Sequence, residues 1–572
     1  MANRLELTWY GKGEPIRIEP RLLIENTELS NISADSGTEN MLIHGDNLLA
    51  LKALEKDFAG QVKCIYIDPP FNTGQAFEHY DDNLEHSIWL NLMNERFKHL
   101  YRLLEANGMF WIHLDDVEVH YCKVLLDEIF TRHNFVSHIT YERSAVAGLG
   151  QGGYLVNTTE HILLYKKGSL PDKINLSYEE LGFNIIKRYN RFVENFGERV
   201  LVREFTAKSN GELVRVYEHS GVEIASISLR DAKKRETEIR EEFAAHLDTL
   251  FRGNRVQKEN EFQNNIIASL DKGKFYSVDY VPSRGKNKGE ETTLYYYNCE
   301  LLSWLKDTTT IENGVLSKSQ KMTTLWKHGE IPKADIANEG GVYFPRSKKP
   351  EQLLHRIIEM STEPGDIVLD SFLGSGTTAA VAHKMGRRYI GIEMGEHAYT
   401  HCKTRLDAVI AGDDLLGITK AMGWKGGGGY RFYELAPTLI NTDAFGEYVI
   451  NEEYDADILA AAVALHEGFR YQPDENLFWK QSVGNENSYL FVTTRHLNGT
   501  YLDSIKDTMQ EDDYLIIACK SFDSGIDKVY ENIVIKKIPQ MLLNRCEFGK
   551  DDYALNIVHP PVYEDEEMES DE

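Results

Sequence analysis

The chain has 572 residues, which is too many for one hydrophobic core, so several domains are expected. Its 42% hydrophobic and 27% charged residues are typical of a soluble globular protein, and no stretch approaches the ~18 apolar residues of a membrane span. The N-terminus has no apolar signal core, and the six cysteines are scattered without a CxxC pair. These features predict a protein of a reducing cytoplasm with neither a disulfide scaffold nor a structural zinc site.

The net charge of −27 is unevenly distributed along the chain. Residues 166–330 hold 27 Lys and Arg against 25 Asp and Glu, whereas residues 431–572 hold 11 against 29. A polyanion such as DNA is therefore expected to contact the middle of the chain rather than its C-terminal third. The acidic tail, residues 564–572, is expected to be a solvated, solubilising end.

Strands and helices alternate from Met41, after a polar N-terminal extension of residues 1–40. Apolar patterning predicts strands at 41–46, 62–68, 109–115 and 160–167, and helices at 47–58, 87–106 and 119–130. Gly108 is expected to stop the second helix. This alternation is typical of a parallel sheet whose ligands bind at the carboxyl ends of the strands.

The alternation is interrupted near Gly168 and resumes near residue 336. Helices are then expected at 350–361 and 377–386, with strands at 366–370 and 388–393. Residues 41–168 and 336–425 are therefore predicted to form one sheet, with residues 169–335 inserted between them. The glycines at 426–429 predict a linker, and residues 430–563 a separate C-terminal α/β or α+β domain.

The stretch "CIYIDPPFNTG" ends an apolar strand in a carboxylate, two prolines and an aromatic ring, Asp68 to Phe71. It could be a rigid turn, or one wall of a pocket that holds a flat ring bearing an amine. The prolines fix φ in either case.

A second motif, "IVLDSFLGSGTTAAVA", ends a buried strand at Asp370 and opens a helix at Thr377. Gly374 and Gly376 let the backbone approach a ligand, while the helix N-terminus directs free N–H groups at it. Glu393 ends the next strand, where a carboxylate can accept ribose hydroxyls. The loop fits both a dinucleotide and S-adenosylmethionine, or an unliganded turn, and no ATPase P-loop is present.

Asp68 favours S-adenosylmethionine over a dinucleotide. The exocyclic amine of adenine is a poor nucleophile because its lone pair is delocalised into the ring. The Asp68 carboxylate and the Pro69 carbonyl can accept hydrogen bonds from the two N–H groups of this amine and direct its lone pair at a methyl donor. Phe71 offers a face for a base extruded from the duplex.

"DPPF" followed much later by "FLGSG" resembles the amino-group DNA methyltransferases of the β arrangement. With "LELTWYGK", "LIHGDNLLALKAL", "TEHILLYKK" and "IPQMLLNRCEF", nearly the whole chain except about 170–330 resembles the Mod subunit of type III restriction–modification systems. The resemblance implies a permuted, doubly wound S-adenosylmethionine-dependent methyltransferase fold. In that family a target-recognition domain is inserted between the two halves.

The resemblance also implies N6 methylation of adenine in a short asymmetric site of double-stranded DNA. Its partners would be a second copy in a homodimer and a separate ATP-dependent restriction (Res) subunit. The implied catalytic residues are Asp68, Pro69, Pro70 and Phe71. The implied S-adenosylmethionine-binding residues are Asp370, Phe372, Gly374, Gly376, Thr377 and Glu393, together with Lys349, Phe344 and Asp46. Phe71 departs from the more usual Tyr, and Asp rather than Ser at position 68 favours adenine over cytosine.

Other residues carry weaker signals. Arg284, Lys286 and Lys288 are candidate phosphate contacts or a solvated loop, and Tyr295 to Tyr297 are candidate base platforms or strand core. His113 is expected to be a satisfied core residue, and no metal site is expected.

Two other functions stay open on the sequence alone. One is a dinucleotide-dependent oxidoreductase, and the other a catalytically idle DNA-recognition subunit. A stand-alone DNA methyltransferase of a defence or phase-variable system is a further alternative to the type III assignment.

Overall fold

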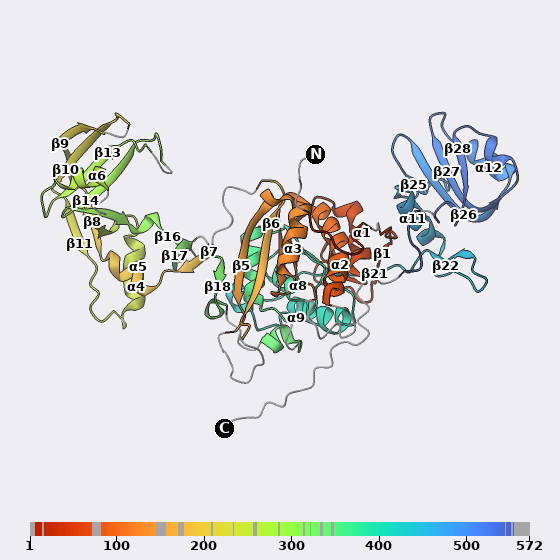
Figure 1. Cartoon of the computed structure of the whole chain (residues 1–572), viewed down its shortest axis with the longest axis horizontal. Coiled ribbons are helices and arrows are strands. Elements are labelled where there is room, and N and C mark those ends of the chain that lie inside the picture. The colour runs from red at the N-terminus through yellow and green to blue at the C-terminus, as the bar shows by residue number, and fades with distance from the viewer. Residues whose placement is uncertain are drawn as a thin grey trace, which may run out of the picture. The chain divides into compact units, whose positions relative to one another are not determined.

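The chain forms two compact units, residues 1–175 with 323–572 (unit 1) and residues 176–322 (unit 2). A computed structural model describes them, and Figure 1 shows the elements of each. The described residues are 6–13, 16–70, 82–144, 156–169, 177–207, 210–232, 234–255, 260–283, 287–312, 315–320, 322–331, 336–344, 348–543, 545–550 and Tyr553.

A ten-stranded sheet forms the centre of unit 1. Its order is β1-β21-β2-β20-β19-β3-β4-β6-β5-β18. The strands are β1 (Leu23–Glu25), β2 (Met41–His44), β3 (Val62–Ile67), β4 (Leu104–Leu114), β5 (Phe135–Glu142), β6 (Thr159–Lys166), β18 (Leu325–Trp326), β19 (Ile367–Asp370), β20 (Arg388–Glu393) and β21 (Arg431–Leu435). Strands from both sides of the insertion thus alternate in one mostly parallel sheet, as the sequence predicts.

Helices pack on this sheet. They are α1 (Asn47–Phe58), α2 (Asp82–Leu103), α3 (Val119–Leu126), α7 (Glu351–Ser361), α8 (Thr377–Lys384), α9 (Thr404–Ala411) and α10 (Thr419–Met422). Apolar side chains of α1, α2 and α3 join those of β3 and β4 in one core cluster, where Trp89, Phe97 and Phe110 are fully buried. The buried sheet thereby becomes a rigid base for the loops at its carboxyl edge.

Two local expectations were wrong. β6 runs antiparallel to β4, and it also pairs antiparallel with β5, a strand that was not predicted. Gly108 lies inside β4 rather than at a helix end. A Cβ at Gly108 would lie 2.8 Å from a Leu104 methyl carbon and 3.0 Å from the Val62 carbonyl, so this glycine permits a close strand contact.

The glycine run does not separate the C-terminal domain from the sheet, because β21 follows it and pairs with β1 and β2. A separate five-stranded sheet comes later: β24 (Arg470–Tyr471), β25 (Ser482–Val483), β26 (Ser488–Leu497), β27 (Tyr514–Phe522) and β28 (Ile533–Lys537). It is accompanied by α11 (Ala456–Glu467), α12 (Gly499–Lys506) and the hairpin β22 (Ile440–Thr442) and β23 (Tyr448–Ile450).

Unit 2 is built on an antiparallel eight-stranded sheet of order β11-β8-β12-β15-β14-β13-β10-β9. Its strands are β8 (Arg191–Asn195), β9 (Glu198–Thr206), β10 (Leu213–Ser220), β11 (Glu223–Ser226), β12 (Leu250–Asn254), β13 (Phe275–Tyr280), β14 (Thr292–Tyr297) and β15 (Glu300–Trp304). A small sheet of β7 (Ser177–Glu180), β16 (Thr309–Glu312) and β17 (Val315–Gln320) and helices α4 (Phe183–Ile186), α5 (Glu236–Ala245) and α6 (Glu261–Ile267) complete it. In the described ranges of both units, no helix is long and apolar enough to cross a bilayer.

Candidate active site

The "DPP" motif lies at the carboxyl end of a central strand. Asp68, Pro69 and Pro70 follow β3, which pairs in parallel with β19. Asp68 and Asp370 therefore end adjacent strands, as the sequence predicts. The buried Trp89 indole donates a hydrogen bond to the Pro70 carbonyl at 3.0 Å, which fixes the end of the motif against α2.

The two carboxylate oxygens of Asp68 have different surroundings. Oδ2 lies 3.1 Å from the Lys349 ammonium nitrogen. Oδ1 is buried and has no hydrogen-bond partner among the described residues. Leaving a buried acceptor unpaired costs about 1–3 kcal/mol. Oδ1 is thus an acceptor that a donor on a bound substrate would satisfy.

A chain of buried polar groups leads away from Asp68. The Lys349 nitrogen lies 3.5 Å from Oε2 of Glu160, and that oxygen lies 2.6 Å from Nε2 of His113. On its other side, His113 Nδ1 lies 3.1 Å from the Tyr66 hydroxyl. His113 is fully buried, with Nδ1 in a hydrogen bond to Tyr66 and Nε2 in an ion pair with Glu160.

Opposite charges in this row of buried groups keep Lys349 and Glu160 ionised. Burial disfavours the Lys349 ammonium, but the carboxylates of Asp68 and Glu160 raise its pKa above the ordinary value. Burial likewise opposes ionisation of Glu160, yet His113 and Lys349 hold the pKa of Glu160 well below its usual range. Lys349 was expected at the cofactor, and the structure places its charge against the carboxylate of the "DPP" motif.

The glycine loop connects β19 to α8. Gly374 has φ +56° and Gly376 has φ +78°, the left-handed region that favours glycine. A Cβ on Gly376 would also lie 3.2 Å from Cys402 Cα. The loop therefore requires glycine at position 376 both for its backbone conformation and for its packing.

Asp370 holds the start of this loop. Its Oδ1 accepts the Phe372 N–H at 2.9 Å, and its Oδ2 accepts the Thr378 hydroxyl at 2.6 Å. Burial raises the pKa of Asp370 to about 7, although these two hydrogen bonds oppose the shift. The negative charges of Asp68 and Glu393 raise it further.

Glu393 ends β20 next to the loop. Its two oxygens accept the backbone N–H groups of Gly374 at 2.7 Å and Gly395 at 3.0 Å. A carboxylate has about four lone-pair sites, so capacity for two hydroxyl donors is left. Its half-buried position leaves it accessible to a ligand.

A buried ionic cluster supports the glycine loop, and the sequence analysis missed it. Arg405 donates to the Thr377 hydroxyl at 2.7 Å and to Glu351 at 2.7 Å. Glu351 also binds Lys384 at 2.8 Å, and Lys384 lies 2.5 Å from Asp414. The only signal in the sequence is that Lys384 ends a helix rich in alanine, and nothing in the sequence distinguishes Arg405.

Asp46 and Phe344 have partners within unit 1. Asp46 caps α1 by accepting two N–H groups of its first turn, and also accepts the Tyr553 N–H at 3.1 Å. Its carboxylate is thus already engaged by the protein. Phe344 packs edge-on against His397 and His401, with ring centroids 5.1 and 5.3 Å apart.

Three candidate residues, Phe71, Arg284 and Lys286, lie outside the described residues. Lys288 is exposed in unit 2. Tyr296 is core, whereas Tyr295 and Tyr297 on the same strand are partly buried. The described parts of the chain contain no group of three or more His, Cys, Asp or Glu side chains placed to bind a metal ion.

The edge around Asp68 and the glycine loop fits S-adenosylmethionine. The buried Ser371 hydroxyl and Asp68 Oδ1 have no hydrogen-bond partner among the described residues. Gly374 and Gly376 keep side chains off the loop, and Glu393 offers acceptors at the end of the neighbouring strand. The residues present would accommodate a polar ligand with hydroxyl and amine donors.

The family is decided by comparison with known sequences. Residues 62–404, which include both motifs, match the family described as DNA methylase. The chain belongs to the DNA methylase family. This membership favours a methyltransferase over the dinucleotide-dependent alternative.

Two methylase relatives cover most of this chain. It is 36% identical over 427 residues to a probable type III restriction-modification enzyme, the HindVI Mod subunit of Haemophilus influenzae, covering 72% of this chain and 56% of that protein. It is 24% identical over 539 residues to the type III EcoP15I Mod subunit of Escherichia coli, covering 81% of this chain and 77% of that one. The chain thus spans little more than half the length of the first relative.

Solved methylase structures are more distant. The crystal structure of the M1.HpyAVI–SAM complex is 15% identical, with a TM-score of 0.29, and the comparison covers 64% of this chain and 99% of that one.

Proposed function

We propose that this DNA methylase transfers a methyl group from S-adenosylmethionine to N6 of adenine in double-stranded DNA. The observation that carries the proposal is the buried, unpaired Oδ1 of Asp68, at the same sheet edge as the glycine loop. A base amine supplies the donor that this oxygen lacks. The hydrogen bond that the amine N–H donates to Asp68 orients the nitrogen lone pair away from the carboxylate.

S-adenosylmethionine, when bound, supplies a methyl group that is already activated on a sulfonium sulfur. Asp370, Phe372, Gly374, Gly376, Thr377 and Glu393 would hold it. The protein then needs mainly to position the two reactants, an effect that can be worth several kcal/mol. The buried cluster around Arg405 and Glu351 keeps the loop in place for this purpose.

Asp68 acts on the amine during the transfer. The amine nitrogen would lose one proton when it accepts the methyl group that S-adenosylmethionine supplies. Asp68 Oδ1, which has no hydrogen-bond partner among the described residues, would receive that proton. Lys349 keeps Oδ2 neutralised, and Glu160 in turn fixes Lys349.

Asp rather than Ser at position 68 and the resemblance to type III Mod subunits support adenine as the target base. The same resemblance supports a modification subunit that forms a homodimer and partners a separate restriction subunit. Unit 2, which overlaps the predicted target-recognition insertion, is the candidate for sequence readout. A strict monomer at micromolar concentration would count against the homodimer.

Methylation-sensitive long-read sequencing of DNA from cells that express the chain tests this function. We expect N6-methyladenine on one strand of a short asymmetric site, absent from cells expressing Asp68→Ala. Modified cytosine would overturn the adenine assignment. Methylation on both strands of a palindrome would instead support a stand-alone methyltransferase.

A further inference from the structure

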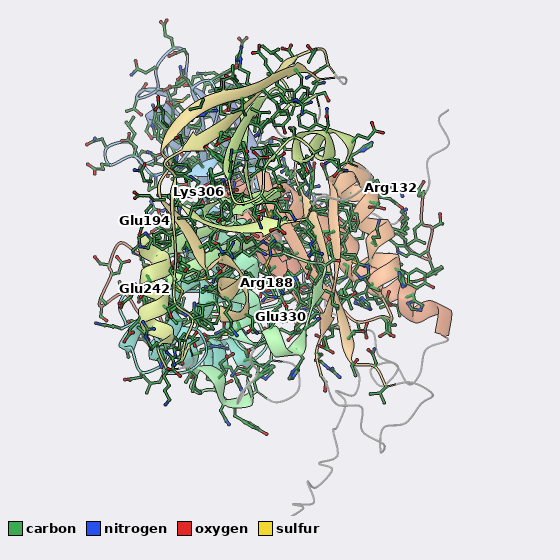
Figure 2. All side chains as sticks on the ribbon, turned by 90° about the vertical axis from the view of Figure 1, so that its left-hand side faces the viewer. Arg132, Arg188, Glu194, Glu242, Lys306 and Glu330 are labelled. Atoms are coloured by element: carbon green, nitrogen blue, oxygen red, sulfur yellow. The ribbon has the colours of Figure 1, made fainter. Side chains whose placement is uncertain are left out.

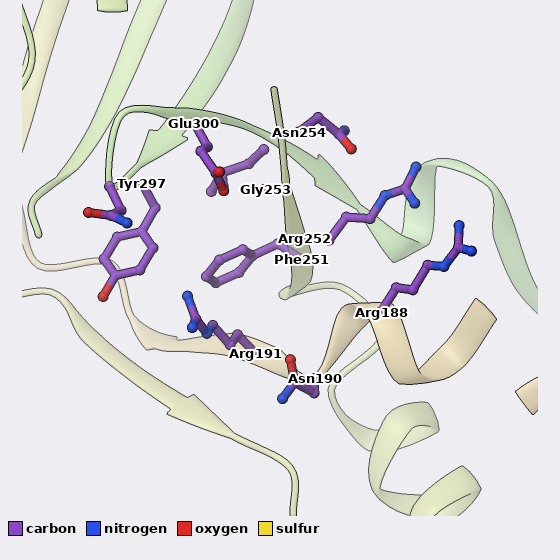
Figure 3. A pocket seen from close by; sticks show the side chains of 11 residues that line it. Arg188, Asn190, Arg191, Phe251, Arg252, Gly253, Asn254, Tyr297 and Glu300 are labelled. Atoms are coloured by element: carbon purple, nitrogen blue, oxygen red, sulfur yellow. The ribbon is translucent and has the colours of Figure 1, made fainter. Parts of the chain in front are cut away.

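Unit 2 contains a pocket of about 400 Å³ that the predicted active site does not use. It lies where the end of β12 approaches the β14–β15 hairpin and the start of β8 (Figure 3). Its polar lining is dominated by three arginines and three asparagines: Arg188, Arg191, Arg252, Asn190, Asn254 and Asn298. Such a lining presents mainly hydrogen-bond donors.

Some arginines of unit 2 are paired with carboxylates, whereas the three arginines of the pocket are not, within the described part of the chain. Arg199 pairs with Asp279 at 2.7 Å, and Arg240 pairs with Glu236 at 2.8 Å. Among the residues that the structure describes, Arg188, Arg191 and Arg252 have no carboxylate within 4 Å. The pocket is thus lined by three guanidinium groups and one carboxylate, Glu300, so its charged lining is net positive.

Two of these arginines are held in place by aromatic rings. The Arg252 guanidinium carbon lies 5.1 Å from the Tyr189 ring centroid, and that of Arg191 lies 6.0 Å from the Tyr297 ring centroid. Arg252 Nε is buried and has no acceptor among the described residues. A guanidinium held in this way loses little rotamer freedom when it binds a ligand.

Arg188 and Arg252 extend to the same side of the pocket in Figure 3, whereas Arg191 points toward Phe251 and Tyr297. Arg188 is exposed and is also labelled in Figure 2. On the other side of the pocket, the Glu300 carboxylate packs against the backbone of Gly253, where a Cβ would lie only 2.1 Å from Glu300 Oε2. An anion is therefore expected at the Arg188–Arg252 side, away from Glu300.

We propose that this pocket binds the sugar–phosphate backbone of duplex DNA, with Arg188 and Arg252 on one phosphate. The inference rests on the proposed function for its choice of DNA as the polyanion. Planar guanidinium groups match phosphate oxygens in pairs, and phosphate contacts fix the register of a protein on the duplex. An acidic protein segment is the competing occupant, and the test separates the two.

Binding of the full-length chain to a fluorescein-labelled 40-base-pair duplex of random sequence tests the pocket. Each of Arg188→Ala and Arg252→Ala should weaken binding roughly five- to tenfold. Each should also lower the slope of log K against log salt by about 0.9, the loss of one phosphate contact. Arg199→Ala, which removes the same charge from a paired arginine of unit 2, should stay within about twofold of the wild type.

Two results would overturn the proposal. One is that Arg188→Ala binds DNA like Arg199→Ala, as expected if an acidic protein occupies the pocket. The other is that the variants bind the random duplex like the wild type but lose affinity, at an unchanged salt slope, for a second duplex that carries the methylation site; that result would indicate base readout. Arg188→Ala, altered at an exposed side chain, decides the outcome if Arg252→Ala fails to fold by circular dichroism. Binding of S-adenosylmethionine is followed in the same samples. If the wild type binds S-adenosylmethionine and the arginine variants bind DNA normally, the pocket proposal fails alone; if the wild type does not bind S-adenosylmethionine, the proposed function fails.

Discussion

At the scale of single residues, the asymmetry of Asp68 has a direct kinetic consequence. Asp68→Asn keeps the side-chain size but removes the charge that faces Lys349 and weakens the acceptor for the amine. We expect the single-turnover methylation rate to fall about 10²–10³-fold, the usual cost of one preorganised transition-state contact. Affinity for S-adenosylmethionine should stay within about threefold. Asp116→Asn, an exposed carboxylate beyond β4, is the control, and equal rates for both variants would argue against the role of Asp68.

Lys349 predicts a change in pH dependence. Lys349→Met removes a cation that helps to hold the pKa of Glu160 down. Protonation of Glu160 should therefore begin to slow methylation at a higher pH than in the wild type. The acid limb of the methylation rate should move up by about one pH unit. Lys349→Arg retains the charge and should restore most of the original profile. An unchanged acid limb in Lys349→Met would contradict this positioning role.

Asp370 links the stability of unit 1 to pH. Its pKa is about 7 in the folded protein and about 3.9 in an unfolded chain, so the native state binds more protons between these values. Stability is therefore fully present below about pH 4 and falls as pH rises to 7. Asp370→Asn removes this loss. In urea unfolding, its free energy of unfolding should rise by about 2–4 kcal/mol relative to that of the wild type as the pH is raised from 5 to 8. Parallel pH dependence of the two proteins would exclude a raised pKa.

At the scale of secondary-structure elements, Glu351 joins α7, α8 and α9. It binds Lys384 and Arg405, and all three side chains are fully buried. Glu351→Gln leaves two cations short of a partner, which typically costs about 3–5 kcal/mol. Glu359→Gln, on the same helix but partly exposed, should change stability by less than about 0.5 kcal/mol. Equal melting temperatures for the two variants would refute a supporting role for the cluster.

Local patterns predicted the elements well where one period dominates. The apolar spacing of α1 and the buried runs of β19 and β20 follow the expected segments closely. The sequence could not reveal that Glu160 meets Lys349, because β6 runs antiparallel and starts at the edge where β4 ends. Lys349 reaches that edge from the other side of the insertion, so the contact depends on tertiary packing alone.

At the scale of the whole molecule, unit 2 is inserted in the sequence between strands that belong to one continuous sheet. β3 lies before the insertion and β19 after it, yet they are neighbours in the sheet. Alternating strands and helices on both sides made this arrangement predictable, and the composition change marked the insertion. The pocket of unit 2 was not predictable, because Arg188, Arg252 and Tyr297 come from three distant stretches.

The proposed reaction as a whole is methyl transfer to the adenine amine at Asp68. The most direct test incubates the purified chain with duplex DNA and S-adenosylmethionine labelled in the methyl group, then separates the nucleosides. We predict label in N6-methyl-2′-deoxyadenosine, and none when Asp68→Ala replaces the wild type. Label in methylated cytosine, or transfer that persists without the Asp68 carboxylate, would contradict the account.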